Sequence, residues 1–243
     1  MAGRTDAGMF RVKEKTMAPD RRRLIVGALA ASVALLPGCA TTGFGGGAQE
    51  ALQRLLEIST GRAVERLVAG NGFLNDPAAR LPVPPELSRG REGAVLGALL
   101  NARPVQQQLS LMVNQAAGEA ADRAAPVIFD AIRRLTFADA LGIVRGGPTS
   151  ATDYLERSVG TGIVDAMLPG VGQVLRGFDG NGVLGPVLGA ATGVNVVAIQ
   201  RVVAVQAARS LFGAIGREEA AIRRDPRSAR DGLVEALLGG RLG

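Results

Sequence analysis

The stretch that decides the fold runs from Asn114 to Tyr154 and reads NQAAGEAADRAAPVIFDAIRRLTFADALGIVRGGPTSATDY. Pairs of apolar residues recur every four positions across its first part and just before it: Met112/Val113, Ala116/Ala117, Ala120/Ala121, Ala124/Ala125 and Ile128/Phe129. Polar residues such as Gln115, Glu119 and Arg123 fill the intervals. A repeat close to 3.6 residues places the apolar pairs on one face of a helix. The stretch therefore predicts an amphipathic helix and contains no catalytic motif.

Proline and capping residues divide this stretch into separate helices. Pro126 is expected to end one helix, Val105 to Ala124, and to open another, Val127 to Leu135, because proline has no backbone N–H to donate. Two pairs have the spacing of a capping box, Thr136 with Asp139 and Ser150 with Asp153. Asp139 and Asp153 are therefore interpreted as helix caps and not as catalytic groups.

The composition favours a single all-α domain. The chain has 243 residues, of which 47% are hydrophobic and only 3% aromatic, so its core must consist mainly of Leu, Val, Ile and Ala. Such a core, with Ala, Leu, Glu and Arg abundant, favours helices, whereas a sheet would contain more Thr, Tyr, Phe and Trp. We expect a bundle-like packing of about eight helices.

The positive charge of the chain belongs largely to its N-terminus. The formal net charge is +6, and residues 1–38 contribute +4 of it, with seven basic and three acidic residues. The remaining residues carry a net +2, so no basic face is expected there. Trp is absent and Tyr occurs once. A nucleic-acid partner is therefore not expected, because single-strand binding relies on aromatic stacking as well as clustered cations.

The chain has no histidine and one cysteine, Cys39. Ser-His-Asp and Cys-His nucleophile systems, zinc clusters and intramolecular disulfides are thereby excluded. Chemistry based on carboxylates and arginine is still open. The sequence predicts no metal site, no cofactor and no enzymatic activity.

The N-terminus has the organisation of an export signal. Arg21, Arg22 and Arg23 precede an uncharged apolar run, LIVGALAASVALL, which is too short for an ordinary transmembrane helix. Leu36-Pro37-Gly38-Cys39 then resembles the bacterial lipobox, in which the cysteine is acylated and becomes the first residue after cleavage. We therefore predict a signal peptide over residues 1–38 and lipid attachment at Cys39. Two or three acyl chains would anchor the chain stably in a membrane.

Export by the general or the twin-arginine route is left open by Arg21 to Arg23, and Met17 is an alternative start. The expected location is the periplasmic side of a bacterial membrane. Ala40, following the modified cysteine, is compatible with sorting to the outer membrane.

Residues 39–47 are predicted to form a flexible, glycine-rich tether, and residues 48–240 the all-α domain. The first helix is expected from Ala48 to Ala69, ended by Asn71-Gly72. A proline-rich segment from Phe73 to Leu87 is expected to form an extended strap across the bundle, because Pro82, Pro84 and Pro85 exclude helix. Its expected anchors are four apolar residues, namely Phe73, Leu74, Leu81 and Val83.

Further helices are expected from Glu86 to Asn101 and from Val194 to Arg224, and a last one from Arg227 to Leu238 behind an Asp225 cap. Glu219 and Arg223 have i,i+4 spacing, and the adjacent Glu218 and Glu219 are interpreted as part of a solvated face. Gly180 to Gly185 formally matches GxGxxG, but no strand precedes it, so no nucleotide loop is predicted.

Several phrases occur in an order that resembles one bacterial family: GFLNDPAARLPVP, NQAAGEAADRAAPVIFDAI, LTFADALGIVRGG, SATDYL and SLFGAIGREEAAIRRDP. On these motifs the chain is similar to the domain-of-unknown-function family 4197 over roughly Ala48 to Leu238. The resemblance implies a secreted protein or lipoprotein with an all-helical domain. It implies no reaction, cofactor or catalytic residue.

The leading functional hypothesis is a non-catalytic cell-envelope lipoprotein that binds a protein partner or supports the envelope. The alternatives are a binder or carrier of an apolar ligand or lipid, suggested by the alanine-lined helix faces, and an enzyme that uses carboxylates and arginine. No catalytic residue is assigned. Apart from Cys39, the candidate interaction or buried-polar residues are Asn114, Glu119, Asn75 and Arg80.

Overall fold

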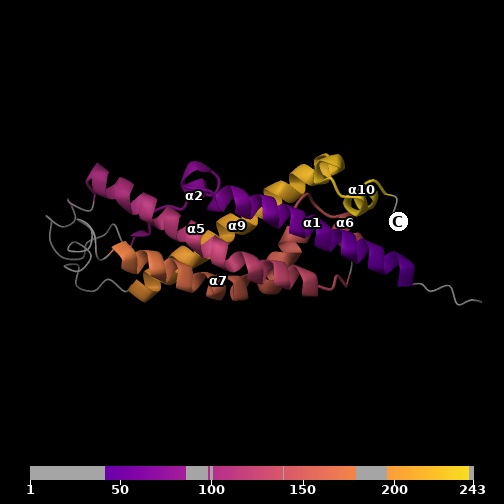
Figure 1. The fold of residues 1–243 in the computed structure, drawn as a ribbon, viewed down its shortest axis with the longest axis horizontal. Coiled ribbons are helices and arrows are strands. Elements are labelled where there is room, and N and C mark those ends of the chain that lie inside the picture. Colours follow the sequence, from indigo (N-terminus) through magenta and orange to yellow (C-terminus); the bar gives the residue numbers. More distant parts are fainter. Residues whose placement is uncertain (1–41, 86–97, 99–100, 139, 179–195, 241–243) are drawn as a thin grey trace, which may run out of the picture. The chain divides into compact units, whose positions relative to one another are not determined.

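The computed structural model describes residues 42–85, 98, 101–138, 140–178 and 196–240 (Figure 1). The prediction of an all-α fold is confirmed, because these ranges contain helices and no strand. The elements in chain order are α1 (Thr42–Val68), α2 (Gly72–Asn75), α5 (Arg103–Arg134), α6 (Ala140–Val144), α7 (Ser150–Phe178), α9 (Val196–Arg224), the 3-10 helix η1 (Pro226–Ala229) and α10 (Gly232–Leu238). The signal peptide with Cys39, the helix from Glu86, Asp139 and the Gly180 to Gly185 motif lie outside the described residues.

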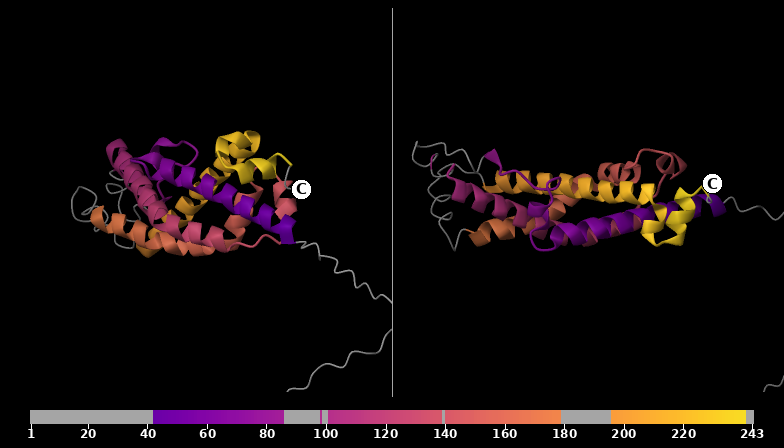
Figure 2. Two further views of the ribbon diagram at one scale, coloured as in Figure 1. Left: turned by 45° about the vertical axis from the view of Figure 1, so that its right-hand side comes forward. Right: turned by 90° about the horizontal axis from the view of Figure 1, so that it is seen from above.

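The long helices α1, α5, α7 and α9 pack against one another around one core (Figures 1 and 2). The apolar doublets of α5 are its inner face, since Met112, Val113, the alanine pairs and Ile128 are all buried. On α1, Leu52, Leu55, Leu56 and Leu67 are buried as well. The periodicity of the sequence thus predicts which side of each helix faces the core.

Every core residue of the described chain lies between Ala48 and Leu237. Residues 40–243 also form a compact unit by themselves. They therefore contain every core residue that the structure describes, and we expect them to fold without the leader.

Helix α5 continues through Pro126, so the prediction of two helices divided at this residue is wrong. Pro126 leaves the carbonyl of Asp122 without its helical donor, but both residues are exposed, so water can satisfy that oxygen. Ala124, Ala125 and Ile128 are buried around the proline and hold both halves of the helix on the core. Pro169 is likewise exposed inside α7.

Helix α1 begins at Thr42, so the predicted flexible tether is wrong over residues 42–47. Ala48, Ala51 and Leu52 are buried and fix the first packed turn. Extending an existing helix is easier than nucleating one, which lets the glycines continue it despite their low helix propensity. At its other end α1 stops at Val68, and Gly70 adopts a left-handed φ of 56°.

The last predicted helix, Arg227 to Leu238, is divided in two. Asp225 precedes the 3-10 helix η1 and makes no side-chain cap. Arg230 then takes a left-handed conformation with φ 53°, and Asp231 caps α10 by accepting from the N–H groups of Leu233 and Val234 at 3.0 and 3.1 Å. The capping residue is therefore Asp231, six positions after the one predicted.

Candidate functional site

The carboxylate of Glu219 on α9 accepts four hydrogen bonds. Its Oε1 accepts the backbone N–H of Ala151 at 3.0 Å, and its Oε2 accepts that of Thr152 at 2.7 Å. The hydroxyl of Thr152 also donates to Oε2 at 2.6 Å. These donors belong to the first turn of α7, whose N–H groups have no partner within the helix. Glu219 therefore caps α7 from a different helix, where the helix dipole also favours a negative charge.

Arg223 completes this arrangement one turn further along α9. Its Nε donates to Oε1 of Glu219 at 2.8 Å, and the other guanidinium nitrogens donate to the carbonyls of Val144 at 2.8 Å and Ile143 at 3.2 Å. It also donates to the hydroxyl of Ser150 at 2.9 Å. The carbonyls are at the C-terminal end of α6, where a cation is favoured. One buried ion pair thus connects the end of α6, the start of α7 and α9.

The pair is almost entirely withdrawn from solvent: the Glu219 side chain is 0% exposed and that of Arg223 10%. The interpretation of Glu219 as part of a solvated face is therefore wrong. The signal was present in the sequence, because Ile215, Glu219 and Ile222 have the i, i+4, i+7 spacing of one buried face. A small residue helps this contact, since a Cβ at Gly216 would lie 3.1 Å from the Thr149 methyl group.

The bonding of Glu219 determines what the pair can do chemically. A carboxylate offers about four acceptor positions, and Glu219 fills them with two backbone N–H groups, one hydroxyl and one guanidinium. No position is free to take a proton from a substrate. The pair is arranged for structural cohesion and not for general acid–base catalysis.

The capping box predicted for Ser150 and Asp153 does not form. Thr149 precedes α7, and its hydroxyl donates to Asp153 at 3.2 Å while its carbonyl accepts the Asp153 N–H at 2.8 Å. Ser150 instead donates to the carbonyl of Ile143 at 2.6 Å. The prediction of Ser150 as the capping residue is wrong, because Glu219 accepts the Thr152 N–H and the Thr149 carbonyl accepts the Asp153 N–H, the two donors that Ser150 would have used.

Asn114 forms the second buried polar site and is 3% exposed. Its Oδ1 accepts the backbone N–H of Leu81 at 2.9 Å, and its Nδ2 donates to the Leu81 carbonyl at 3.2 Å and to the Ser110 carbonyl at 2.8 Å. Residues 81–84 have no helix, so Leu81 could not bond its backbone within an element of its own. The amide of Asn114 replaces that missing partner.

Asn75 and Arg80 lie on either side of a turn and do not join Asn114 in a common site. Asn75 is exposed at the end of α2. Arg80 is exposed and donates to the carbonyl of Leu74 at 2.6 Å. Between them, Asp76 accepts the N–H of Ala78 at 2.9 Å, which stabilises the turn after α2.

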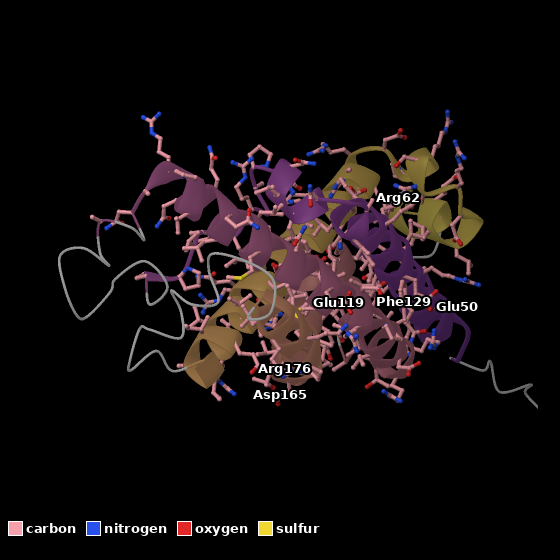
Figure 3. The ribbon with its side chains drawn as sticks, turned by 60° about the vertical axis from the view of Figure 1, so that its left-hand side comes forward. Glu50, Arg62, Glu119, Phe129, Asp165 and Arg176 are labelled. Atoms are coloured by element: carbon pink, nitrogen blue, oxygen red, sulfur yellow. The ribbon has the colours of Figure 1, made fainter. Side chains whose placement is uncertain are left out.

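Glu119 lies on α5 and pairs with Arg123 at 2.7 Å, and Arg123 reaches Gln173 on α7. The neighbouring α7 side chains Asp165 and Arg176 point away from the bundle (Figure 3). Glu119 therefore belongs to a solvent-accessible network at the α5 and α7 surface.

Glu218 belongs to another network. It pairs with Arg66 of α1, which lies 4.0 Å from Asp76, and Asp76 also receives Arg217 at 3.1 Å. Glu119 and Glu218 each have their own arginine partner, Arg123 and Arg66. Across the described ranges no three acidic, cysteine or histidine side chains are grouped to hold a metal ion.

Gln53 is a capping residue that sequence reasoning did not identify. Its Nε2 lies 3.3, 3.1 and 3.0 Å from the carbonyl oxygens of Ile132, Arg133 and Leu135. These oxygens belong to the C-terminal end of α5, so Gln53 of α1 caps that end. Glu219 of α9 caps the start of α7 in the same way. A contact across 79 or more residues leaves no local pattern in the sequence.

The alanine face of α5 is filled by α7. Ala116, Ala117, Ala120 and Ala121 are 0% exposed, and a Cβ at Gly170 would lie 2.9 Å from Ala120 Cα. The two backbones are therefore in close contact, and this face does not favour the apolar-ligand hypothesis.

The fold and these sites define an all-helical protein in which a buried carboxylate and a buried amide join segments distant in the sequence. Residues 46–239 match the model of the family described as protein of unknown function (DUF4197), and the chain belongs to this family. Comparisons with curated proteins and with solved structures found no match. None of the described helices has the length and apolar character needed to cross a membrane.

Proposed function

We propose that this protein is a lipid-anchored, non-catalytic component of the bacterial cell envelope. The observation that carries the proposal is the position of Cys39, the single cysteine of the chain. It directly follows a basic segment, a short apolar run and Leu36-Pro37-Gly38, the order that lipoprotein processing requires. Acylation there would hold residues 40–243 at a membrane facing the periplasm.

The bonding of the polar residues supports a non-catalytic role. Glu219 and Arg223 are used to join three helix ends, and Asn114 is used to bind the backbone of Leu81. These side chains are occupied by bonds inside the protein. A catalytic site needs polar side chains that a substrate can reach. A helical domain with a polar surface, held at a membrane by a lipid anchor, suits a protein that binds a partner in the envelope.

Metabolic labelling tests the anchor. Cells expressing the full chain would be grown with labelled palmitate, beside cells expressing Cys39→Ser. We expect label in the wild-type band and none in the variant, whose leader also stays attached because cleavage depends on the modified cysteine. A wild-type chain that is processed normally without incorporating label would overturn the proposal.

Crosslinking tests the role. The anchored wild-type chain would be treated with a short amine- and carboxyl-reactive crosslinker in intact envelopes and recovered. A defined crosslinked species that depends on the folded domain, and is lost in Glu219→Gln, supports a partner-binding role. Reproducible turnover of a substrate by residues 40–243 would contradict the non-catalytic assignment.

A further inference from the structure

Positive charge is unevenly distributed among the four long helices. Helix α1 has three basic and three acidic residues, α5 has four and three, and α7 has two and three. Helix α9 has five arginines and two glutamates, a net charge of +3. The expectation that no basic face exists after the leader is based on the summed charge of residues 39–243. That sum hides the difference between α7, with a net charge of −1, and α9, with +3.

Both glutamates of α9 are directed away from open solvent. Glu219 is buried against α7, and the side chain of Glu218 is 15% exposed and paired with Arg66 of α1. The acidic groups of α9 are thereby neutralised by partners. Its outward face is left with arginines.

Four exposed residues, here called the arginine face, follow one side of α9: Arg209, Gly213, Arg217 and Arg224. Their spacings of four, four and seven residues keep them on one side, with successive arginines about 10 to 12 Å apart along the axis. A Cβ at Gly213 would meet only Arg217 Nη1, at 3.7 Å. No other side chain of the described residues covers the helix surface at Gly213, between Arg209 and Arg217. Figure 2 shows α9, in orange and yellow, running beside α1.

The arginine face carries little compensating charge. Arg217 reaches Asp76 at 3.1 Å and is still 41% exposed. Within the described ranges Arg209 and Arg224 form no ion pair. No acidic residue of α9 shares the face. Such a surface is complementary to a dense array of negative charges.

We propose that the arginine face binds the surface of an anionic phospholipid bilayer. The proposal rests on the proposed function, since an anchor at Cys39 would hold the domain within reach of such a surface and raise its effective concentration there. Guanidinium groups bind phosphate oxygens in a bidentate manner, which suits phospholipid headgroups. Each arginine near an anionic bilayer is expected to raise the partition constant about fivefold.

A nucleic acid would be the other polyanion, and the aromatic residues argue against it. The only tyrosine, Tyr154, donates to the Thr136 carbonyl at 2.9 Å and packs on Phe137 with ring centroids 5.2 Å apart. It is thus placed at the start of α7 and not on the arginine face. The arginine face therefore lacks the aromatic stacking platform on which single-stranded nucleic acids bind.

The test uses residues 40–243, which contain every core residue that the structure describes, and vesicles of phosphatidylglycerol and phosphatidylcholine in equal parts. We expect the protein to sediment with these vesicles at low salt and to stay in solution with pure phosphatidylcholine. Binding should be lost near 1 M salt, where the Debye length is about 3 Å. The triple variant Arg209→Gln, Arg217→Gln, Arg224→Gln should bind on the order of 100-fold more weakly.

A charge-matched control carries Arg134→Gln, Arg157→Gln and Arg176→Gln, which are exposed on α5 and α7. Circular dichroism would establish that both triple variants are folded. The proposal predicts near wild-type vesicle binding for this control. Equal losses in the two variants, no binding to anionic vesicles, or binding only to a short DNA duplex would each overturn it. Because this assay lacks the leader, its outcome is independent of palmitate labelling at Cys39, and each proposal can fail alone.

Discussion

Glu219 and Arg223 form an almost entirely buried ion pair, with Arg223 Nε 2.8 Å from Glu219 Oε1, and together they bind the ends of two other helices. Removing one member would leave the other charge buried and unpaired. We therefore expect Glu219→Gln to lower the free energy of unfolding by about 3 to 5 kcal/mol, measured by urea denaturation. Arg223→Met should cost a similar amount.

The adjacent Glu218 provides the matched control for this prediction. It pairs with Arg66, whose side chain is 45% exposed, so solvent screens the interaction. Glu218→Gln should change the stability by no more than about 1 kcal/mol. Equal effects of the two glutamate substitutions would show that burial of the ion pair is not what stabilises this end of the bundle.

The Asn114 amide is expected to hold the segment around Leu81 on α5. Asn114→Ala leaves the Leu81 N–H and carbonyl without their partner, which should cost about 2 to 3 kcal/mol. Hydrogen exchange at the Leu81 amide should accelerate more than exchange in the centre of α7. The neighbouring Gln115 is exposed, and Gln115→Ala should change the stability by less than about 0.5 kcal/mol. Unchanged exchange at Leu81 in the Asn114 variant would refute the role assigned to this amide.

Two glycines of α7 should respond to alanine in opposite directions. At Gly170 a Cβ would lie 2.9 Å from Ala120 Cα, so Gly170→Ala should force α5 and α7 apart and cost about 1 to 3 kcal/mol. At Gly162 nothing lies within 4 Å, and Gly162→Ala should stabilise the helix by about 0.4 to 1 kcal/mol. Thermal unfolding of the two variants measures both effects. Stabilisation by both substitutions would mean that α5 and α7 are not in close contact.

Pro126 is exposed in the middle of α5 and removes one helical hydrogen bond. Pro126→Ala restores an N–H that can bond to the carbonyl of Asp122, so the variant should be more stable by roughly 1 to 3 kcal/mol. Pro104 lies in the first turn of the same helix, where the missing N–H costs nothing. Pro104→Ala should therefore give no such gain, and a loss of stability in Pro126→Ala would indicate that the core packing depends on the proline.

Sequence reasoning was most successful where the determinant was local and periodic. The doublets of α5 and the leucines of α1 predict the buried faces, and the ordered motifs identify the family. The prediction at Pro126 is wrong because it used the local rule that proline ends a helix. Tertiary packing on both sides of Pro126 overrides this rule.

The site could be predicted only in part. Asn114 was selected as a candidate because no local partner was available to it, although its partner Leu81 lies 33 residues away. The sequence interpretation assigns Glu219 to a solvated face together with its neighbour Glu218, and this is wrong for Glu219. The donors that make it a buried cap, at Ala151 and Thr152, are 68 and 67 residues distant, and only the fold brings them together.

The central claim, that the protein is anchored through Cys39, is tested most directly by mass spectrometry of the mature N-terminus. Digestion with trypsin should release residues 39–54, because Arg54 is the first basic residue after Cys39. From the membrane fraction we predict this peptide with Cys39 as its first residue, carrying a diacylglyceryl group and an acylated amine. A mature chain that begins at another residue, or an unmodified Cys39 in that peptide, would contradict the account.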